Sequence, residues 1–377
     1  MKTCNVFVCA LLAGSLAAQQ QPPELTGTVS FSIGSDSGRV ERIAVQVGDG
    51  GTGKYKAILA GDPLLPTHAI YRPRDLKPFG GKLLLPIVAF GNGGCRNSSG
   101  EFRNLLSDIA SHGYVVVAIG PAGDAVVAGS EGRTGMTQAS QLLDGVDWIA
   151  RENSREGSEY YLKIDTGKVA VMGQSCGTGQ ASQVSSDPRV ATTVLLNGGG
   201  PMGGARPGPA EGGAAATPAP ARGGANLAPG EYGNANAATA VNDMFSALDK
   251  MSRRYAPYAP AIPQTLPSGA AGTQPVTFHG PVAFIPGGYS DLAFKGAVAG
   301  YEAVQKVTAL LAYQDVGHYP ATYRQPNGGA YAVAVNAWLD WHLKGDRSAS
   351  EMFVGASCGL CQDPKWTIKI KNVPEAK

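Results

Sequence analysis

The chain has 377 residues, of which 43% are hydrophobic and 16% are charged, so it can bury a substantial core. Its formal net charge is +2, and its lysines and arginines are scattered along the chain instead of gathered in a basic run. These features exclude the electrostatic surface of a nucleic-acid-binding protein. At roughly 150 residues per domain, the length permits two domains or one large domain with an insertion, and the distribution of apolar runs favours the second.

The first residues have the pattern of an export signal. Lys2 provides a positive start, residues 6–16 are apolar but too few to span a bilayer, and Ser15 and Ala17 fit a small-x-small cleavage site. We therefore expect residues 1–18 to be a signal peptide and the mature protein to be secreted and extracellular. A buried N-terminal helix or a membrane anchor is the alternative.

From residue 83 onward, short runs rich in Val, Ile and Leu alternate with segments of helical character. This alternation is typical of an α/β fold with a mostly parallel central sheet flanked by helices. Earlier strands, at 29–33, 43–47 and 68–71, are expected to pair antiparallel at one edge. The parallel strands are expected at 83–90, 114–119, 168–172, 192–196, 281–285 and 307–313. The helices are expected at 102–111, 136–152, 178–185, 292–306 and 330–343.

Residues 198–270 interrupt the alternation, because Gly, Ala and Pro dominate this stretch and leave little apolar surface to bury. Within it, residues 241–255 carry apolar side chains at helical spacing, which predicts one helix that docks on the body. The insertion is either a lid over a substrate cleft or a linker without a role. We expect one α/β domain over residues 19–345 and a C-terminal tail over 346–377.

A short apolar run ends in Gly173-Gln174-Ser175-Cys176-Gly177, and a segment of helical character follows. This is a G-x-S-x-G motif between a strand and a helix, in which the serine lies on a strained turn where a side chain at either glycine would clash. The amino end of the helix favours developing negative charge. The motif predicts Ser175 as a nucleophile; a plain glycine-rich strand exit is the alternative.

A serine nucleophile needs a histidine to take its proton and an acid to orient that histidine. After a G-x-S-x-G serine, the acid and then the histidine follow in the chain. His318 follows the expected strand at 307–313, whereas His279 precedes a strand, and reactive groups gather at the carboxyl ends of parallel strands. His318 is therefore the predicted base, with a surface-turn histidine as the alternative. The histidines set aside, which precede the serine or fall in an expected helix, are His68, His112 and His342.

The predicted acid is Asp291, which follows the expected strand at 281–285 after a Gly-Gly turn. Asp315 is the runner-up, but it lies only three residues before His318, and its backbone would have to fold back to reach the ring. A helix cap at the start of the next helix is a second role for Asp291, and the two roles are compatible.

An oxyanion formed at an ester carbonyl needs prepositioned donors, and two backbone N–H groups usually serve. The N–H of Cys176, directly after the nucleophile, is the first candidate. The second is expected in the loop at 91–95, after the strand at 83–90, where three glycines let the backbone come close to a substrate. A simple glycine-rich turn is the alternative.

Two of the six cysteines, Cys4 and Cys9, lie in the expected signal peptide. The remaining even number, in an oxidising compartment, predicts two disulfides with three possible pairings. Cys358 and Cys361 form a C-x-x-C motif, which also occurs in redox pairs and zinc sites. No second such motif and no paired histidines lie near it, so we expect no metal.

Asn97, Ser98 and Ser99 form an N-glycosylation sequon. In a secreted protein, this triplet predicts a glycan on Asn97. Such triplets are also common by chance.

The segment 91–119 contains Arg96-Asn97-Ser98, an expected helix and then Ser111-His112-Gly113-Tyr114. Together with the turns at Ser175, Asp291 and His318, it resembles secreted polyester hydrolases, cutinase-like enzymes and dienelactone-hydrolase-like esterases. The likeness covers residues 83–200 and 278–345. It implies an α/β-hydrolase fold for the domain at 19–345, in which the low-complexity insertion of this chain follows strand 6, and a Ser–Asp–His triad.

The resemblance also implies Gly93 as the oxyanion position, which an aromatic residue fills in the polyester hydrolases. The glycine removes a possible aromatic clamp, and the insertion and the tail have no counterpart in those enzymes. In the implied fold, Cys95 and Cys176 lie together, which predicts a disulfide that fixes both oxyanion donors. Cys358 and Cys361 would form the second disulfide.

These observations predict a secreted carboxylic ester hydrolase that forms an acyl-enzyme intermediate on Ser175. A peptidase or amidase with the same triad, and a catalytically inactive secreted binding protein of the same fold, are the alternatives. We expect a small-molecule or polymeric ester as substrate, no cofactor, no nucleic-acid or membrane partner, and a monomer.

Overall fold

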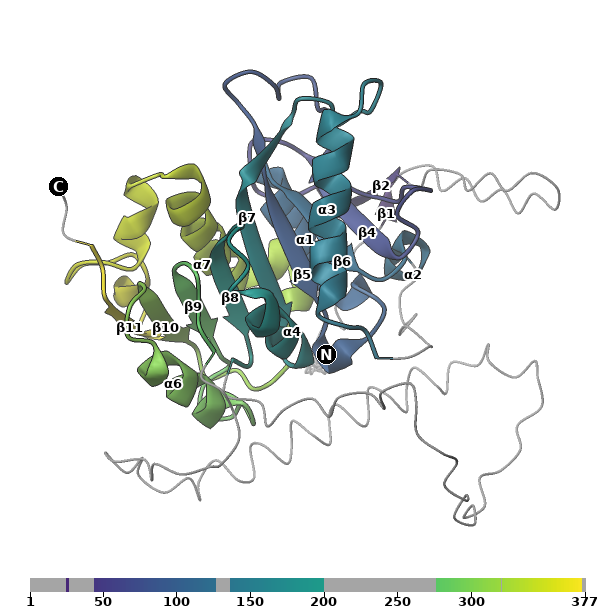
Figure 1. Cartoon of the computed structure of the whole chain (residues 1–377). Helices are drawn as coiled ribbons and strands as arrows, with labels where there is room; N and C mark the ends of the chain where they lie inside the picture. The colour runs from purple at the N-terminus through teal and green to yellow at the C-terminus, as the bar shows by residue number, and fades with distance from the viewer. Residues whose placement is uncertain (1–24, 27–43, 127–135, 200–275, 320, 375–377) are drawn as a thin grey trace, which may run out of the picture.

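The computed structural model describes residues 25–26, 44–126, 136–199, 276–319 and 321–374 (Figure 1). The expected signal peptide, the strand at 29–33, the helix at 241–255 and nearly all of the insertion lie outside the described residues. The described chain forms one sheet of eleven strands in the order β1-β2-β3-β4-β6-β5-β7-β8-β9-β10-β11.

Six neighbouring strands, from β6 to β10 in this order, are mutually parallel, and the strands at both edges are antiparallel. The strands are β1 (Leu25–Thr26), β2 (Ala44–Val47), β3 (Ala57–Ala60), β4 (His68–Pro73), β5 (Leu85–Gly91), β6 (Val115–Ile119), β7 (Ile164–Gln174), β8 (Val190–Leu196), β9 (Val282–Ile285), β10 (Ala309–Tyr313) and β11 (Thr367–Lys371). The helices are α1 (Arg103–Ser111), α2 (Ala122–Val126), α3 (Ser140–Ser154), α4 (Cys176–Val184), α6 (Phe294–Ala303) and α7 (Gly329–Leu339).

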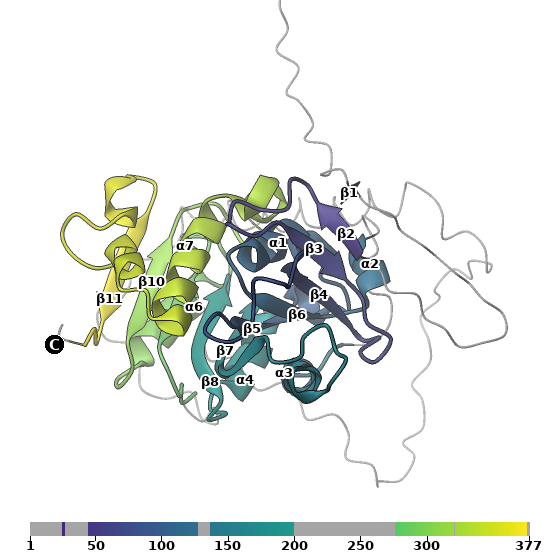
Figure 2. The same cartoon turned by 90° about the horizontal axis from the view of Figure 1, so that it is seen from above.

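Helices cover both faces of the sheet, and each face has its own hydrophobic core. Alternate residues of β5 show this directly, because Val88 and Phe90 belong to the core under α1 and α7, whereas Ile87 and Ala89 belong to the core under α3, α4 and α6. Figure 2 shows α1 and α3 on opposite sides of the strands. Strands buried on both faces are apolar throughout, which is why the sequence shows continuous apolar runs there.

All six expected parallel strands and all five expected helices are present, and the expected antiparallel edge is confirmed at β2 and β4. The expected start of one helix at Met136 is wrong, since α3 begins at Ser140. Thr137 instead donates its backbone N–H and its hydroxyl to the carbonyl oxygen of Cys95, which holds this segment out of the helix. The sequence analysis missed β3, β11 and α2, which have only four or five residues each.

The predicted C-terminal tail is part of the same fold. Its strand β11 pairs antiparallel with β10 and extends the sheet by one strand. Phe353, Leu360 and Trp366 lie in the core under α7, where the Trp366 ring packs against Tyr331 with ring centroids 5.4 Å apart. The tail therefore closes one end of the hydrophobic core, which its loop-rich sequence did not indicate.

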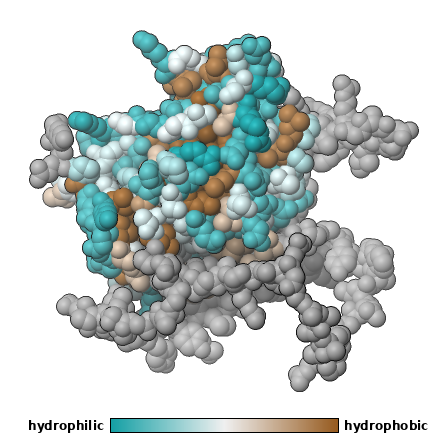
Figure 3. Space-filling view, viewed as in Figure 1, coloured by the Kyte–Doolittle hydropathy of each residue, from teal (hydrophilic) through white to brown (hydrophobic). Residues whose placement is uncertain are grey.

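The described helices include none that is both long and apolar enough to cross a membrane. On the face of the molecule shown in Figure 3, apolar residues form several separate groups among polar ones. Scattered groups of this kind are normal on a protein surface.

Candidate active site

Ser175 lies in the turn between β7 and α4, at the carboxyl edge of the parallel strands. Its backbone has φ 52° and ψ −115°, a conformation that non-glycine residues rarely adopt. A Cβ atom added to Gly173 would lie 2.2 Å from the carbonyl oxygen of Gly177, and one added to Gly177 would lie 2.1 Å from the carbonyl oxygen of Gly91 on β5. Both flanking positions therefore require glycine, for the steric reason that the motif predicts.

Three side chains from three separate loops form a continuous hydrogen-bonded chain. Oγ of Ser175 is 2.8 Å from Nε2 of His318, and Nδ1 of His318 is 2.6 Å from Oδ1 of Asp291. The serine follows β7, the aspartate follows β9 and the histidine follows β10. The histidine is 7% exposed and the aspartate 3%, while the serine is half-buried. The structure thus brings together the predicted nucleophile, base and acid.

Asp291 accepts hydrogen bonds at both carboxylate oxygens. Oδ2 accepts from the N–H of Gly287 at 2.8 Å and from the side chain of Asn197 at 2.9 Å, and Oδ1 also accepts from the N–H of Ala293 at 2.8 Å. Burial raises the pKa of Asp291, but the hydrogen bond and charge of His318, with the two backbone N–H groups, outweigh burial and leave the pKa below its ordinary value. The carboxylate is therefore ionised at neutral pH. Its bond to Ala293 also stabilises the turn that leads into α6, but the expected helix cap is wrong, because Ala293 holds the N-cap position and no side chain caps this helix.

Asn197 is a buried polar residue that holds Asp291 in place. Asn197 directly follows β8, is fully buried and has φ 51°. Besides its bond to Asp291, its Nδ2 donates to the carbonyl oxygen of Gly317 at 3.2 Å, and its Oδ1 accepts from the Tyr323 hydroxyl. Burial, and then the neighbouring Tyr331 and Asp291, raise the pKa of Tyr323 well above its ordinary value, so this hydroxyl stays protonated and donates. Asn197 therefore ties the acid loop to the base loop.

The loop after β5 approaches Ser175 from the neighbouring strand, because Gly91 pairs in register with Gly173. The buried side chain of Asn92 fixes this loop by donating to the carbonyl oxygens of Arg96 at 2.9 Å and of Ile119 at 2.7 Å. Two polar bonds at its start thus hold the predicted oxyanion loop in one conformation.

Gly93 begins the short 3-10 turn Gly93–Cys95 in this loop. A Cβ atom added to Gly93 would lie 3.2 Å from the hydroxyl of Tyr319, whose ring packs edge-on against His318 with ring centroids 5.1 Å apart. Gly93 therefore lies near Tyr319, the residue that follows His318 in the chain. The N–H of Cys176 is at the start of α4, next to Ser175. Both predicted oxyanion donors thus belong to segments that border the nucleophile.

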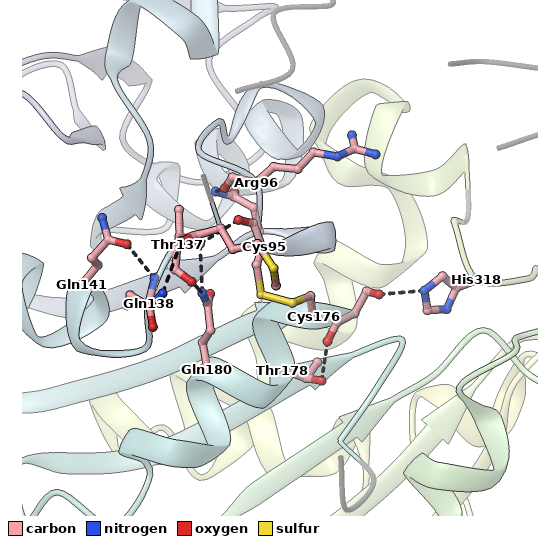
Figure 4. Close-up of a disulfide and its surroundings, with 12 residues drawn as sticks. Cys95, Arg96, Thr137, Gln138, Gln141, Cys176, Thr178, Gln180 and His318 are labelled. Atoms are coloured by element: carbon pink, nitrogen blue, oxygen red, sulfur yellow. Dashed lines mark hydrogen bonds between the residues drawn. A yellow bond between two sulfur atoms is a disulfide. The ribbon is translucent and has the colours of Figure 1, made fainter. Parts of the chain in front are cut away.

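Cys95 and Cys176 form a disulfide with their Cα atoms 5.2 Å apart, although 81 positions separate them in the chain. Figure 4 shows this bond between the end of the Gly93–Cys95 turn and the residue that follows the nucleophile. The carbonyl oxygen of Cys95 accepts two hydrogen bonds from Thr137, which in turn accepts two from the side chain of Gln180 on α4. The predicted pairing is confirmed, and the disulfide and this network connect the Gly93–Cys95 turn to α4 at two places.

Removing this disulfide is expected to destabilise the protein more than removing the second one. The double variant Cys95→Ser/Cys176→Ser frees a loop of 81 positions, which predicts a loss of about 4.5 kcal/mol in the free energy of unfolding. The matched control, Cys358→Ser/Cys361→Ser, frees a loop of 3 positions, for which the same model predicts about 2 kcal/mol. Denaturant titration of the two variants measures both values; equal losses would contradict the loop-length argument.

The alternatives considered from the sequence lie outside the triad. The N–H of His279 donates to the carbonyl oxygen of Ser185 just before β9 begins, so His279 is at the opposite edge of the sheet. Asp315 is exposed and accepts from the N–H of Ser290 at 2.7 Å, which braces the acid loop without contacting the base. The other histidines lie in or beside β4, α1 and α7, and are His68, His112 and His342.

The sequon at Asn97 is part of the loop that follows the disulfide cysteine. Asn97 is half-buried, and the hydroxyl of Ser99 is enclosed in the core, 2.9 Å from the hydroxyl of Tyr71. Glycosylation would have to occur before Ser99 packs against Tyr71, and it stays a prediction.

Cys358 and Cys361 of the tail form the second disulfide, with Cα atoms 5.0 Å apart. The predicted pairing is therefore confirmed, and the C-x-x-C motif forms a local disulfide across 3 positions. Over the described ranges, no cluster of three or more His, Cys, Asp or Glu side chains is placed to bind a metal ion.

The sequence analysis did not identify the residues that support the triad. Asn197 follows the expected strand at 192–196, so its polar side chain at a strand's carboxyl end was a usable signal. Gln174 occupies a variable position of the G-x-S-x-G motif and had no such signal. Tyr323 and Thr137 lie far from the motif in the chain, and only the tertiary structure connects them to the site.

No protein-family model matches the chain, and no curated protein is similar to it in sequence.

Proposed function

We propose that the protein is a secreted serine carboxylesterase of the α/β-hydrolase type, which forms an acyl-enzyme intermediate on Ser175. The observation that carries the proposal is the hydrogen-bonded chain from Ser175 through His318 to Asp291, with heavy-atom distances of 2.8 and 2.6 Å. A strained strand-to-helix turn that carries the serine, followed in the chain by the acid and then the base, is the arrangement of α/β-hydrolases. The two disulfides accord with an oxidising, extracellular location.

In the first half-reaction, Oγ of Ser175 attacks the ester carbonyl carbon while Nε2 of His318 accepts the hydroxyl proton. Asp291 accepts from Nδ1 of the imidazolium and stabilises its charge. The N–H groups of Cys176 and Gly93 donate to the oxyanion of the tetrahedral intermediate. When this intermediate collapses, His318 returns the proton to the leaving alkoxide and the alcohol departs.

In the second half-reaction, water attacks the acyl-enzyme. His318 takes a proton from the water molecule, the same two N–H groups hold the second oxyanion, and Ser175 leaves with the proton that His318 returns. The carboxylic acid is released and the enzyme returns to its starting protonation state. No further reactant besides water is required.

A fluorophosphonate probe and a short-chain ester test this proposal together. We expect the probe to label the peptide that contains Ser175 and the protein to hydrolyse p-nitrophenyl acetate or butyrate. The matched control is Ser185→Ala. Ser185 is buried at the carboxyl end of α4, the helix that follows Ser175, and its hydroxyl donates to the carbonyl oxygen of Ser182 at 2.7 Å. This variant should still be labelled and active.

The outcomes distinguish the alternatives. Faster turnover of the matching anilide than of the ester would favour a peptidase or amidase. If the folded protein is not labelled and does not hydrolyse the ester, a binding protein is favoured and the proposal is overturned.

A further inference from the structure

Gln174 directly precedes Ser175, and its side chain contacts both the loop that carries His318 and the loop at 91–95. It is the last residue of β7 and is fully buried. Its Nε2 donates to the backbone carbonyl oxygen of His318 at 3.1 Å. The strand that carries Ser175 therefore also holds the backbone of the base, through a side chain whose orientation is fixed by burial.

The other end of the same carboxamide lies against the oxyanion loop. A Cβ atom added to Gly93 would lie only 2.1 Å from Oε1 of Gln174, far inside van der Waals contact. Oε1 itself is buried and accepts no hydrogen bond from any described group. The space that a side chain at position 93 would need is therefore occupied by the amide of Gln174.

We propose that Gln174 is a positioning residue, which sets the spacing between the base loop and the oxyanion loop and which is the reason that position 93 is glycine. The inference rests on the proposed esterase function. By donating to the carbonyl oxygen of His318 while contacting Gly93, one side chain fixes the backbone of the base relative to the backbone of an oxyanion donor.

This role is distinct from those of the other supporting residues. Asp291 holds the imidazole ring of His318, and Asn197 holds Gly317, which precedes it. Neither contacts the oxyanion loop. The Cys95–Cys176 disulfide holds the far end of that loop but not the base. Tyr319 also lies near both sides, with its ring against His318 and its hydroxyl 3.2 Å from a Cβ at Gly93, but only Gln174 donates a hydrogen bond to the backbone of His318 among these described side chains.

The proposal predicts a non-additive pair of substitutions. Gln174→Met keeps the side-chain length but removes the donor to His318, and is expected to lower kcat about tenfold, the cost of one hydrogen bond, with little change in KM. Gly93→Ala is expected to lower kcat about 100-fold, because its methyl group displaces the amide and shifts catalytic groups by about 1 Å. The double variant Gly93→Ala/Gln174→Ala removes the 2.1 Å clash and leaves the methyl group 3.2 Å from the Tyr319 hydroxyl, which a shift of that hydroxyl relieves. We expect its kcat to be within about threefold of that of Gln174→Ala, because residues in contact do not act additively and the methyl group costs little once the amide is gone.

Asn153→Ala provides the control for a purely structural effect. Its Oδ1 accepts from the N–H groups of Lys163 and Ile164 at 2.9 Å each, at the start of the same strand. This variant should melt at a lower temperature and keep an unchanged kcat. A variant that misplaces His318 would instead lower kcat. Melting temperatures of all variants show whether each remains folded at the assay temperature.

Steady-state kinetics with p-nitrophenyl butyrate decides the question. If Gln174→Ala fails to restore activity to Gly93→Ala, so that the two losses multiply, the role of Gln174 is overturned while an active wild type leaves the esterase function intact. A wild type that hydrolyses no ester overturns both proposals.

Discussion

Replacing Ser175 with alanine is expected to lower kcat by about 10⁴- to 10⁶-fold, the range found when a triad serine is removed. The 2.8 Å contact to Nε2 of His318 places the hydroxyl where the imidazole can take its proton, and no other group in the turn can replace it. KM should change little, because the hydroxyl contributes more to the transition state than to substrate binding. Steady-state kinetics and loss of fluorophosphonate labelling measure the effect.

The backbone at position 175 supplies an internal control. Alanine meets the same strain as serine at φ 52°, so the melting temperature should stay close to that of the wild type. Ser175→Gly relieves that strain, so this variant should be equally inactive but more stable by about 1–3 kcal/mol. Activity that persists in either variant would show that the nucleophile is another residue.

The second large effect is expected for Asp291→Asn, which should lower kcat by about 10⁴-fold at neutral pH. Oδ2 of Asp291 accepts from Gly287 and Asn197, so an asparagine that keeps both bonds places its oxygen there. It then loses the bond from the N–H of Ala293 and turns its NH₂ group toward Nδ1 of His318. The imidazole must then accept at Nδ1 and carry its proton on Nε2. In that tautomer it cannot take the proton of Ser175. The ratio of kcat values for wild type and variant measures this loss.

Asp315→Asn is the matched control, because Asp315 lies in the adjacent loop and contacts the N–H of Ser290 instead of the base. We expect its kcat to stay within a few-fold of the wild-type value.

The stability of the Asp291→Asn variant gives a second measurement. Since the pKa of Asp291 is lowered in the folded state, its carboxylate stabilises the fold above the ordinary carboxyl range, and this contribution is lost as the pH falls below about 4. The gap in unfolding free energy between wild type and Asp291→Asn should therefore narrow in acid; a constant gap would contradict the assigned shift.

The sequence predicted that Ser175, Asp291 and His318 meet at one edge of the sheet better than it predicted the residues packed around them. Ser175, Asp291 and His318 each follow an apolar run, and parallel strands bring such positions to one edge of the sheet, so local pattern and topology were sufficient. The same reasoning placed Cys95 beside Cys176. Topology rather than side-chain detail decided these predictions.

The supports depend on packing, which a one-dimensional pattern does not contain. The contact between Oε1 of Gln174 and Gly93 requires β5 and β7 to be neighbours and the oxyanion loop to fold back over the strand end. The bond from Tyr323 to Asn197 spans 126 positions in the chain. The start of α3 at Ser140 was missed for the same reason, because a tertiary hydrogen bond from Thr137 to Cys95 overrides the local helical pattern.

The last strand of the sheet has a consequence for how the protein behaves at high concentration. β11 lies at the outer end of the strand order, so one row of its backbone groups has no neighbouring strand in the described sheet. An open row of this kind is a template for a second molecule, and such contacts lead to fibrous aggregates. Lys369 and Lys371 alternate with Ile368 and Ile370 along β11. Two molecules joined edge to edge would bring these lysines together, so charge repulsion discourages self-association there without disturbing the isoleucines that pack on the core.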